Sequence, residues 1–225
     1  MISVRESLRI VRSRIEKACE RSGRDPANIK LIGVTKGVSV EKILEALDEG
    51  LVDIGENYVQ EAKKKWEFLR ERNVIWHMIG HIQTNKAKYV PHIFSYVHSI
   101  DRLRILELLN VPNKPLKVLF QMNLAGEETK SGIRSEEELF DILKKAKDMK
   151  NIEPIGLMII PPYSPEPENS RPHFRKLREI LYIANERLAM NMTELSMGMS
   201  QDFEVAIEEG ATMLRIGTAI FGERR

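Results

Sequence analysis

A lysine follows a short apolar run near the start of the chain. Residues 30–35 read KLIGVT, and Lys36 comes next, before Gly37 and a helical pattern that begins at Ser39. A primary amine at the end of a buried strand can form a Schiff base with an aldehyde or ketone once it has lost its proton. Lys36 is therefore the candidate nucleophile, provided that the fold supplies burial or a nearby cation to favour the neutral amine.

Two glycine-containing segments late in the chain have the residue types of a phosphate site. Gly198 and Ser200 follow one apolar run, and Gly217 and Thr218 follow the next. Glycine lets the backbone approach a ligand closely, and Ser or Thr suits the N-cap position of a helix. Helix N-termini offer free N–H groups and a positive dipole end to an anion. The two segments together predict phosphate binding, although each hydroxyl alone could merely cap its own helix.

The elements that must position these residues alternate along the chain. Apolar runs of strand length alternate with helical patterns, after a long first helix over residues 3–22. The predicted strands cover residues 30–35, 52–55, 74–80, 94–100, 117–124, 153–160, 194–198 and 213–217. Strands alternating with helices predict an α/β fold with a parallel sheet. Eight such units in 225 residues favour a single (β/α)8 TIM-type barrel with an extra N-terminal helix, forming one domain over residues 1–225. An open doubly wound sheet is the alternative, but no glycine fingerprint follows the first strand.

A barrel would bring the candidate residues to one mouth. Active sites of such barrels lie at the C-terminal ends of the strands, where Lys36 and both glycine segments fall. Arg215 belongs to the last strand, which neighbours the first strand in a closed barrel, so it is a candidate cation for Lys36. A structural ion pair between Arg215 and a barrel carboxylate such as Glu56 is the alternative role. An amine beside a phosphate site predicts a phosphorylated aldehyde or ketone as ligand.

The composition excludes several classes of function. Lys and Arg (35) nearly balance Asp and Glu (33), and the basic residues are interleaved with acids rather than gathered into an arm. This balance gives no electrostatic case for a nucleic acid or membrane partner. One cysteine, Cys19, rules out an internal disulfide framework. Because we also find no signal peptide and no apolar span, we expect a cytoplasmic protein.

The motifs resemble those of one family, the pyridoxal-phosphate homeostasis proteins, which are relatives of the N-terminal barrel of alanine racemase. The matching segments lie in order between residues 33 and 222 and read GVTKG, GENYVQE, WHMIGHIQTNK, SID, QMNLAGEETKSG, GLM, LSMGMSQDFEVAI and RIGTAIFG. The resemblance implies a fold-type III pyridoxal-phosphate barrel that acts in intracellular homeostasis of this cofactor. Such proteins are generally taken to bind the cofactor and deliver it to apoenzymes that require it.

The resemblance implies roles for the residues at the mouth. Lys36 would carry pyridoxal 5'-phosphate as an internal aldimine. Ser200, Gly217 and Thr218 would hold its phosphate, in agreement with the prediction from the residues themselves. Arg215 would face the pyridine nitrogen and disfavour its protonation, which makes the ring a poorer electron sink.

Two further residues would line the pocket in the family, Asn57 of GENYVQE and His81. His77 and His81 have the i, i+4 spacing of a metal pair on a helix. Here they straddle a predicted strand end with no cysteine cluster nearby, so we predict no metal site.

Three functions remain open on the sequence. The chain stops at Arg225, so we expect no counterpart of the second, β-rich domain that supplies the opposing base in alanine racemase. This favours a non-catalytic carrier of pyridoxal phosphate. The first alternative is a pyridoxal-phosphate racemase or lyase that uses Lys36 as its sole base. The second is a cofactor-free Schiff-base aldolase that acts on a sugar phosphate.

Overall fold

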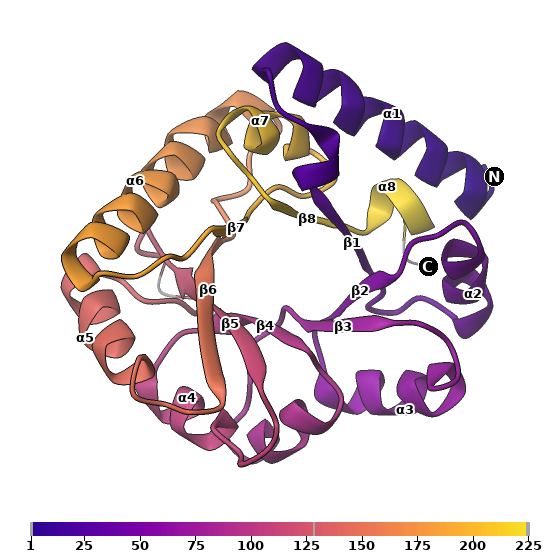
Figure 1. Cartoon of the computed structure of the whole chain (residues 1–225). Helices are drawn as coiled ribbons and strands as arrows, with labels where there is room; N and C mark the ends of the chain where they lie inside the picture. Colours follow the sequence, from indigo (N-terminus) through magenta and orange to yellow (C-terminus); the bar gives the residue numbers. More distant parts are fainter. Residues whose placement is uncertain (1, 128, 224–225) are drawn as a thin grey trace.

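Eight parallel strands close into a barrel in the computed structural model, which describes residues 2–127 and 129–223 (Figure 1). Each strand pairs with its neighbours in chain order, and the last pairs with the first. The strands are β1 (Lys30–Val34), β2 (Asp53–Glu56), β3 (Ile75–Met78), β4 (Tyr96–Ile100), β5 (Leu116–Met122), β6 (Ile152–Ile159), β7 (Glu194–Ser196) and β8 (Met213–Ile216). The predicted (β/α)8 barrel is therefore confirmed.

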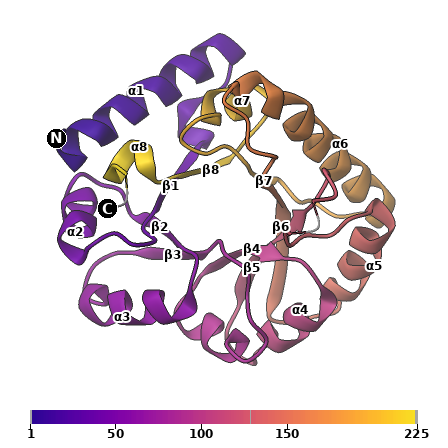
Figure 2. The same cartoon turned by 180° about the vertical axis from the view of Figure 1, so that it is seen from behind.

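The helices lie outside the ring of strands in both views (Figure 1, Figure 2). They are α1 (Val4–Ser22), α2 (Val40–Asp48), α3 (Val59–Leu69), α4 (Leu103–Leu109), α5 (Glu136–Ala146), α6 (Arg171–Leu188), α7 (Phe203–Glu208) and α8 (Thr218–Phe221), with 3-10 helices η1 (Pro26–Asn28), η2 (Ala87–His92) and η3 (Pro167–Ser170). No helix in the described residues is both long and apolar enough to cross a membrane.

The extra N-terminal helix α1 packs against α7, α8 and α2. Ser3 begins it, because the Ser3 hydroxyl accepts a hydrogen bond from the backbone N–H of Glu6. Gly23 ends it in the left-handed conformation, with φ of 66°. Leu8, Val11, Ile15 and Cys19 form an apolar stripe along α1, and all four side chains are buried.

The segment between β3 and β4 departs from the sequence prediction. A helical pattern over NKAKYVPHI becomes only the 3-10 helix η2, which contains Pro91. Proline has no N–H to donate and clashes with the preceding turn, so a regular α-helix does not extend through it. Strand β3 is also shorter than predicted and ends at Met78, two residues before Gly80.

Apolar side chains fill two separate regions. The larger core lies between the strands and the surrounding helices. A smaller cluster of Ile32, Leu119, Met158 and Met213, from four different strands, fills the inside of the barrel. Layers of side chains from alternate strands are the usual filling of such a barrel. Buried polar side chains share this interior, and they matter for the site below.

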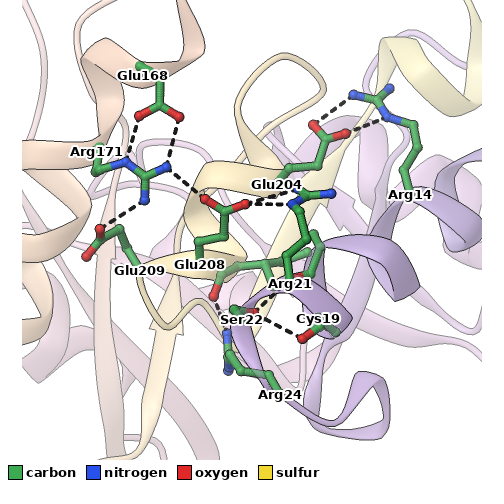
Figure 3. Close-up of polar contacts among 12 residues, drawn as sticks. Arg14, Cys19, Arg21, Ser22, Arg24, Glu168, Arg171, Glu204, Glu208 and Glu209 are labelled. Carbon is green, nitrogen blue, oxygen red and sulfur yellow. Dashed lines mark hydrogen bonds and ion pairs between the residues drawn. The ribbon is translucent and has the colours of Figure 1, made fainter.

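Helix α7, which follows the first glycine segment, is fixed from two sides by ion pairs (Figure 3). From α1, Arg14 contacts Glu204 at 2.8 Å and Arg21 contacts Glu208 at 3.0 Å. From the start of α6, Arg171 contacts Glu208 at 2.7 Å. These contacts attach α7 to its neighbours and so support the loop that precedes it.

Candidate functional site

Pairing of β1 with β8 brings the candidate lysine and the last glycine segment together. In the register of these two strands, Gly33 lies opposite Ile216. A Cβ atom placed on Gly217 would lie 3.4 Å from the Cβ atom of Val34. Lys36 is two residues beyond Val34, so it and Gly217 leave neighbouring strands at the same edge of the barrel.

The loop that carries Lys36 is held by a buried lysine. Gly37 has a φ of 70°, which favours glycine, and its N–H donates to Oε1 of Glu61 at 2.6 Å. Lys65, only 7% exposed, donates from Nζ to the carbonyl oxygen of Thr35 at 2.6 Å and to Glu61 at 2.7 Å. Both residues beside Lys36 are thus fixed by side chains of α3.

Glu56 completes this buried network. Its Oε1 accepts hydrogen bonds from Lys65 Nζ and from the hydroxyl of Thr35, both at 2.6 Å. Burial raises the pKa of Glu56, and the hydrogen bonds from Lys65 and Thr35 oppose that rise. Glu56 therefore pairs with Lys65, and the alternative ion pair between Arg215 and Glu56 is not formed.

Sequence reasoning missed Lys65. It stands in the run EAKKKW, which has the composition of a solvated helix face. The one signal was its position four residues after Glu61, a spacing that puts both side chains on one side of a helix.

The amine of Lys36 faces an aromatic ring at the rim. Lys36 Nζ lies 5.0 Å from the ring centroid of Tyr58, the residue just before α3. Tyr58 is 53% exposed, so the ring lies at the surface of the mouth. The Lys36 side chain is half-buried and is within reach of a ligand that enters from solvent.

The two glycine segments meet at the start of α8. Ser200 Oγ accepts a hydrogen bond from the backbone N–H of Ala219 at 3.2 Å. Asp202, not Ser200, is the residue at the N-cap of α7, and Gly217 precedes α8. The prediction that Ser200 occupies the N-cap of the following helix is therefore wrong, because the chain makes another turn before α7 begins. Its hydroxyl instead accepts from the first turn of α8, beside Thr218.

Gly198 is required by the backbone of the first segment. It has a φ of +92°, and a Cβ atom there would lie 2.6 Å from the Cβ atom of Ala206. Such a conformation and such a close approach exclude other residues without a shift of α7. The backbone carbonyl of Gly198 also accepts from the N–H of Arg215 at 3.0 Å, which ties this segment to β8.

Arg215 extends across the inside of the barrel. It is 4% exposed, and its guanidinium donates from Nη1 to Ser196 Oγ at 2.5 Å and from Nη2 to the carbonyl oxygen of Ile159 at 2.8 Å. Burial lowers the pKa of Arg215 to about 10, so the side chain remains charged at neutral pH. A fixed cation therefore lies on the strand next to the one that leads to Lys36.

Asn57 and His81 occupy different surroundings. The side-chain Oδ1 of Asn57 is buried and has no hydrogen-bond partner among the described residues. His81 is largely exposed, with Nδ1 3.0 Å from Asp101 Oδ2 and 2.9 Å from Ser131 Oγ. His77 is fully buried, so it shares neither the surroundings nor the partners of His81. In residues 2–127 and 129–223 we find no group of three His, Cys, Asp or Glu side chains suited to a metal ion.

The residues at this mouth fit a ligand that has both a carbonyl and a phosphate. Lys36 offers an amine, and the joined segments around Ser200 and Thr218 offer a hydroxyl pair and the start of a helix. The unpartnered oxygen of Asn57 is a further polar group that a bound ligand could satisfy. Pyridoxal phosphate has these groups, and the residues are compatible with it.

Comparison with known sequences gives a consistent result over the length of the chain. The family model described as alanine racemase, N-terminal domain, matches residues 7–225. A pyridoxal phosphate homeostasis protein of Aquifex aeolicus is 45% identical, over 98% of this chain and 98% of that protein. The protein of the same name from Pseudomonas aeruginosa is 41% identical, over 100% of this chain and 97% of that protein.

Solved structures agree with the sequence comparison. PipY of Synechococcus elongatus, in a structure with PLP bound, is 30% identical, with a TM-score of 0.82 over 93% of this chain and 100% of that chain. Alanine racemase of E. faecalis is 16% identical with a TM-score of 0.71 and shares the fold, and the match covers 59% of its chain. This chain belongs to the family of pyridoxal phosphate homeostasis proteins, whose barrel is that of the N-terminal domain of alanine racemase.

Proposed function

We propose that this chain binds pyridoxal 5'-phosphate through a Schiff base on Lys36 and acts in homeostasis of that cofactor. The observation that carries the proposal is the joining of β1 and β8, which brings Lys36 to the segment of Gly217 and Thr218. The name of the curated relatives and the bound PLP of PipY support it. When bound, the cofactor supplies an aldehyde and an aromatic ring that can accept electrons.

The chain's own residues would divide the work of binding. Ser200, Gly217 and Thr218 would hold the phosphate at the start of α8, where the Ser200 hydroxyl already meets the first turn of the helix beside Thr218. Arg215 would face the pyridine nitrogen and, as a fixed cation, would oppose its protonation. Asn57 and His81 would line the remaining wall.

Storage and delivery of the cofactor, rather than amino-acid turnover, suits the character of this mouth. A cationic partner for the ring nitrogen weakens the ring as an electron sink, which slows chemistry at the α-carbon of an amino acid. The rim is open, since Tyr58 is 53% exposed and the His81 side chain 47% exposed. An open rim favours release, so we propose apoenzymes that require pyridoxal phosphate as recipients, in the cytoplasm.

Replacement of the lysine tests the covalent site. We expect the wild-type protein to take up pyridoxal phosphate, turn yellow and, after borohydride reduction, carry a pyridoxyl adduct on the peptide that contains Lys36. Lys36→Ala should lose the adduct and bind at least about tenfold more weakly, because the covalent bond is gone. Lys63→Ala, at an exposed position of α3, is the matched control and should retain both properties. An adduct that persists in Lys36→Ala would contradict the proposal.

The network below Lys36 generates a second expectation. Lys65→Met removes the ammonium that bonds to Thr35 and leaves the buried Glu56 unpaired, a change that costs about 3–5 kcal/mol of unfolding free energy. Urea unfolding should show this loss, and cofactor uptake should weaken as the loop of Lys36 loosens. The double variant Glu56→Gln with Lys65→Met should regain much of the stability but not the uptake, and Lys64→Met should leave both unchanged. Equal uptake by Lys65→Met and the wild type would show that the network does not position Lys36.

Hydrogen exchange distinguishes a carrier from a racemase or lyase. The cofactor-loaded protein is incubated with single amino acids in D2O, and deuterium at the α-carbon is measured by NMR. We expect no exchange above that caused by free pyridoxal phosphate. Steady exchange that is abolished by Lys36→Ala would favour an enzyme with Lys36 as its base.

A further inference from the structure

A continuous chain of hydrogen bonds crosses the inside of the barrel. His77 Nε2 lies 2.8 Å from Asp53 Oδ1, and His77 Nδ1 lies 2.9 Å from His98 Nε2. His98 Nδ1 lies 2.7 Å from Ser196 Oγ, which accepts from Arg215 Nη1 at 2.5 Å. The five side chains come from β2, β3, β4, β7 and β8, and all are buried. Since β4 and β7 are not neighbours in the sheet, the bond between His98 and Ser196 spans the interior.

The ends of this chain give it one direction. Arg215 can only donate, and the carboxylate of Asp53 can only accept. The Ser196 hydroxyl, which already accepts from Arg215, therefore donates its proton to Nδ1 of His98. A neutral His98 then donates from Nε2 to Nδ1 of His77, and His77 donates from Nε2 to Asp53. Both imidazoles are neutral and carry their proton on Nε2.

The opposite direction would require a buried charge. If His98 donated to Ser196 instead, His77 would have to donate from both nitrogens and would be an imidazolium ion. Burial lowers the pKa of His77, although Asp53 opposes this change. Burial also lowers the pKa of His98 well below its ordinary value, and the positive charges of Arg215 and Lys30, and of His77 whenever it is protonated, add to that effect. Donation from Ser196 toward Asp53, with both imidazoles neutral, is therefore the favoured arrangement.

The surroundings of the histidines are largely apolar inside and polar at one end. Tyr96 from β4 stacks on the ring of His77, with centroids 4.4 Å apart, and Lys117 from β5 lies 5.5 Å from the ring of Tyr96. Lys30 from β1 lies 3.5 Å from Asp53 Oδ1. Lys30 and Asp53 line a cavity of about 580 Å³ at the amino-terminal ends of the strands, which also includes Glu194 from β7. Solvent thus reaches the Asp53 end, opposite to the mouth.

We propose that His77 and His98 are positioning residues that act on Arg215 through Ser196. The inference rests on the proposed function, in which Arg215 faces the ring of pyridoxal phosphate. The chain of hydrogen bonds turns the lone pairs of the Ser196 hydroxyl toward Arg215 and so fixes the position of the guanidinium. When His98 is protonated, its Nδ1 donates to Ser196 Oγ instead of accepting from it. The Ser196 hydroxyl then faces two donors, His98 and Arg215, and a second cation lies near Arg215. The cofactor site is thereby sensitive to acid although Arg215 itself stays charged.

The chain of hydrogen bonds is tested first, in protein without cofactor. In ¹⁵N NMR spectra of the unloaded protein, His77 and His98 should both be neutral with the proton on Nε2 at neutral pH, and both should remain neutral as the pH falls through the ordinary histidine pKa of about 6.5. Assignments come from His77→Asn and His98→Leu. A proton on Nδ1 of either ring, or titration near the ordinary value, would overturn the proposal.

The cofactor provides the second readout. Ser196→Ala removes the acceptor of Arg215, so we expect about tenfold weaker binding of pyridoxal phosphate and a shifted visible band, as when a buried charged donor loses its partner. His98→Leu should shift the band in the same direction, while Ser196→Thr should restore it. His92→Leu, at an exposed position of η2, is the matched control. Circular dichroism identifies any variant that fails to fold. If Ser196→Ala or His98→Leu does not fold, the visible band of Ser196→Thr and the NMR spectra of the wild type test the proposal.

The outcomes separate the inference from the proposed function. If the wild type takes up no pyridoxal phosphate, the proposed function fails, while the NMR spectra still test the chain. If Ser196→Ala and His98→Leu bind the cofactor with unchanged affinity and an unchanged band, the inference is overturned and the function stands.

Acid unfolding gives the pH dependence with a defined sign. The folded-state pKa values of both histidines lie below their unfolded value, so the unfolded chain binds more protons in acid. The stability that the two neutral histidines contribute is fully present above about pH 6.5 and is lost as the pH is lowered. Each histidine raises the unfolding constant by up to about tenfold for each pH unit. His98→Leu should show a shallower loss than His92→Leu, and equal slopes would contradict the buried, neutral state of His98.

Discussion

Closure of the barrel by β1 and β8 is the constraint on which the site depends. These strands begin 183 residues apart, at Lys30 and Met213, yet the two residues are direct partners in the sheet. The pairing puts the loop of Lys36 beside the start of α8, and the bond from Ala219 to Ser200 adds the loop after β7. Without closure an amine and a phosphate site would lie on unrelated parts of the chain. The helices α1, α7 and α8 pack together outside this seam and support it.

Two buried charged groups set the geometry of the mouth. The ammonium of Lys65 lies under the loop of Lys36, and the guanidinium of Arg215 lies inside the barrel. A buried charge is expensive unless its hydrogen bonds are satisfied, so each group tolerates few arrangements of its neighbours. Lys65 is matched by Glu56 and Glu61, whereas Arg215 is matched by a hydroxyl and a carbonyl oxygen. Arg215 therefore retains a positive charge that no carboxylate in residues 2–127 and 129–223 contacts directly, which suits a role against a cofactor ring.

The sequence alone was sufficient for the barrel and for the location of the mouth. Apolar runs of strand length and helical patterns depend on local burial, and every predicted strand is present with shifts of a few residues at its ends. The segment before β4 was predicted to be an α-helix but forms a 3-10 helix, because Pro91 prevents regular α-helical hydrogen bonding. The predicted N-cap role of Ser200 was wrong, because its partner Ala219 lies in the first turn of α8 and no local sequence pattern indicates this contact.

The interior network was beyond sequence reasoning for a related reason. Lys65 has the surroundings of a surface residue in sequence, and only the packing of α3 against β2 buries it. The histidine chain joins strands that are far apart in sequence, so His77 and His98 looked like separate residues on different strands. Long-range pairing of side chains follows from the closed barrel and cannot be obtained before the barrel is known.

A crystal structure of the protein grown with pyridoxal phosphate tests the central claim most directly. The account predicts continuous electron density from Lys36 Nζ to the cofactor, with the phosphate at Ser200, Gly217 and Thr218 and the ring nitrogen facing Arg215. Cofactor density attached to another lysine, or a phosphate bound away from the start of α8, would contradict it.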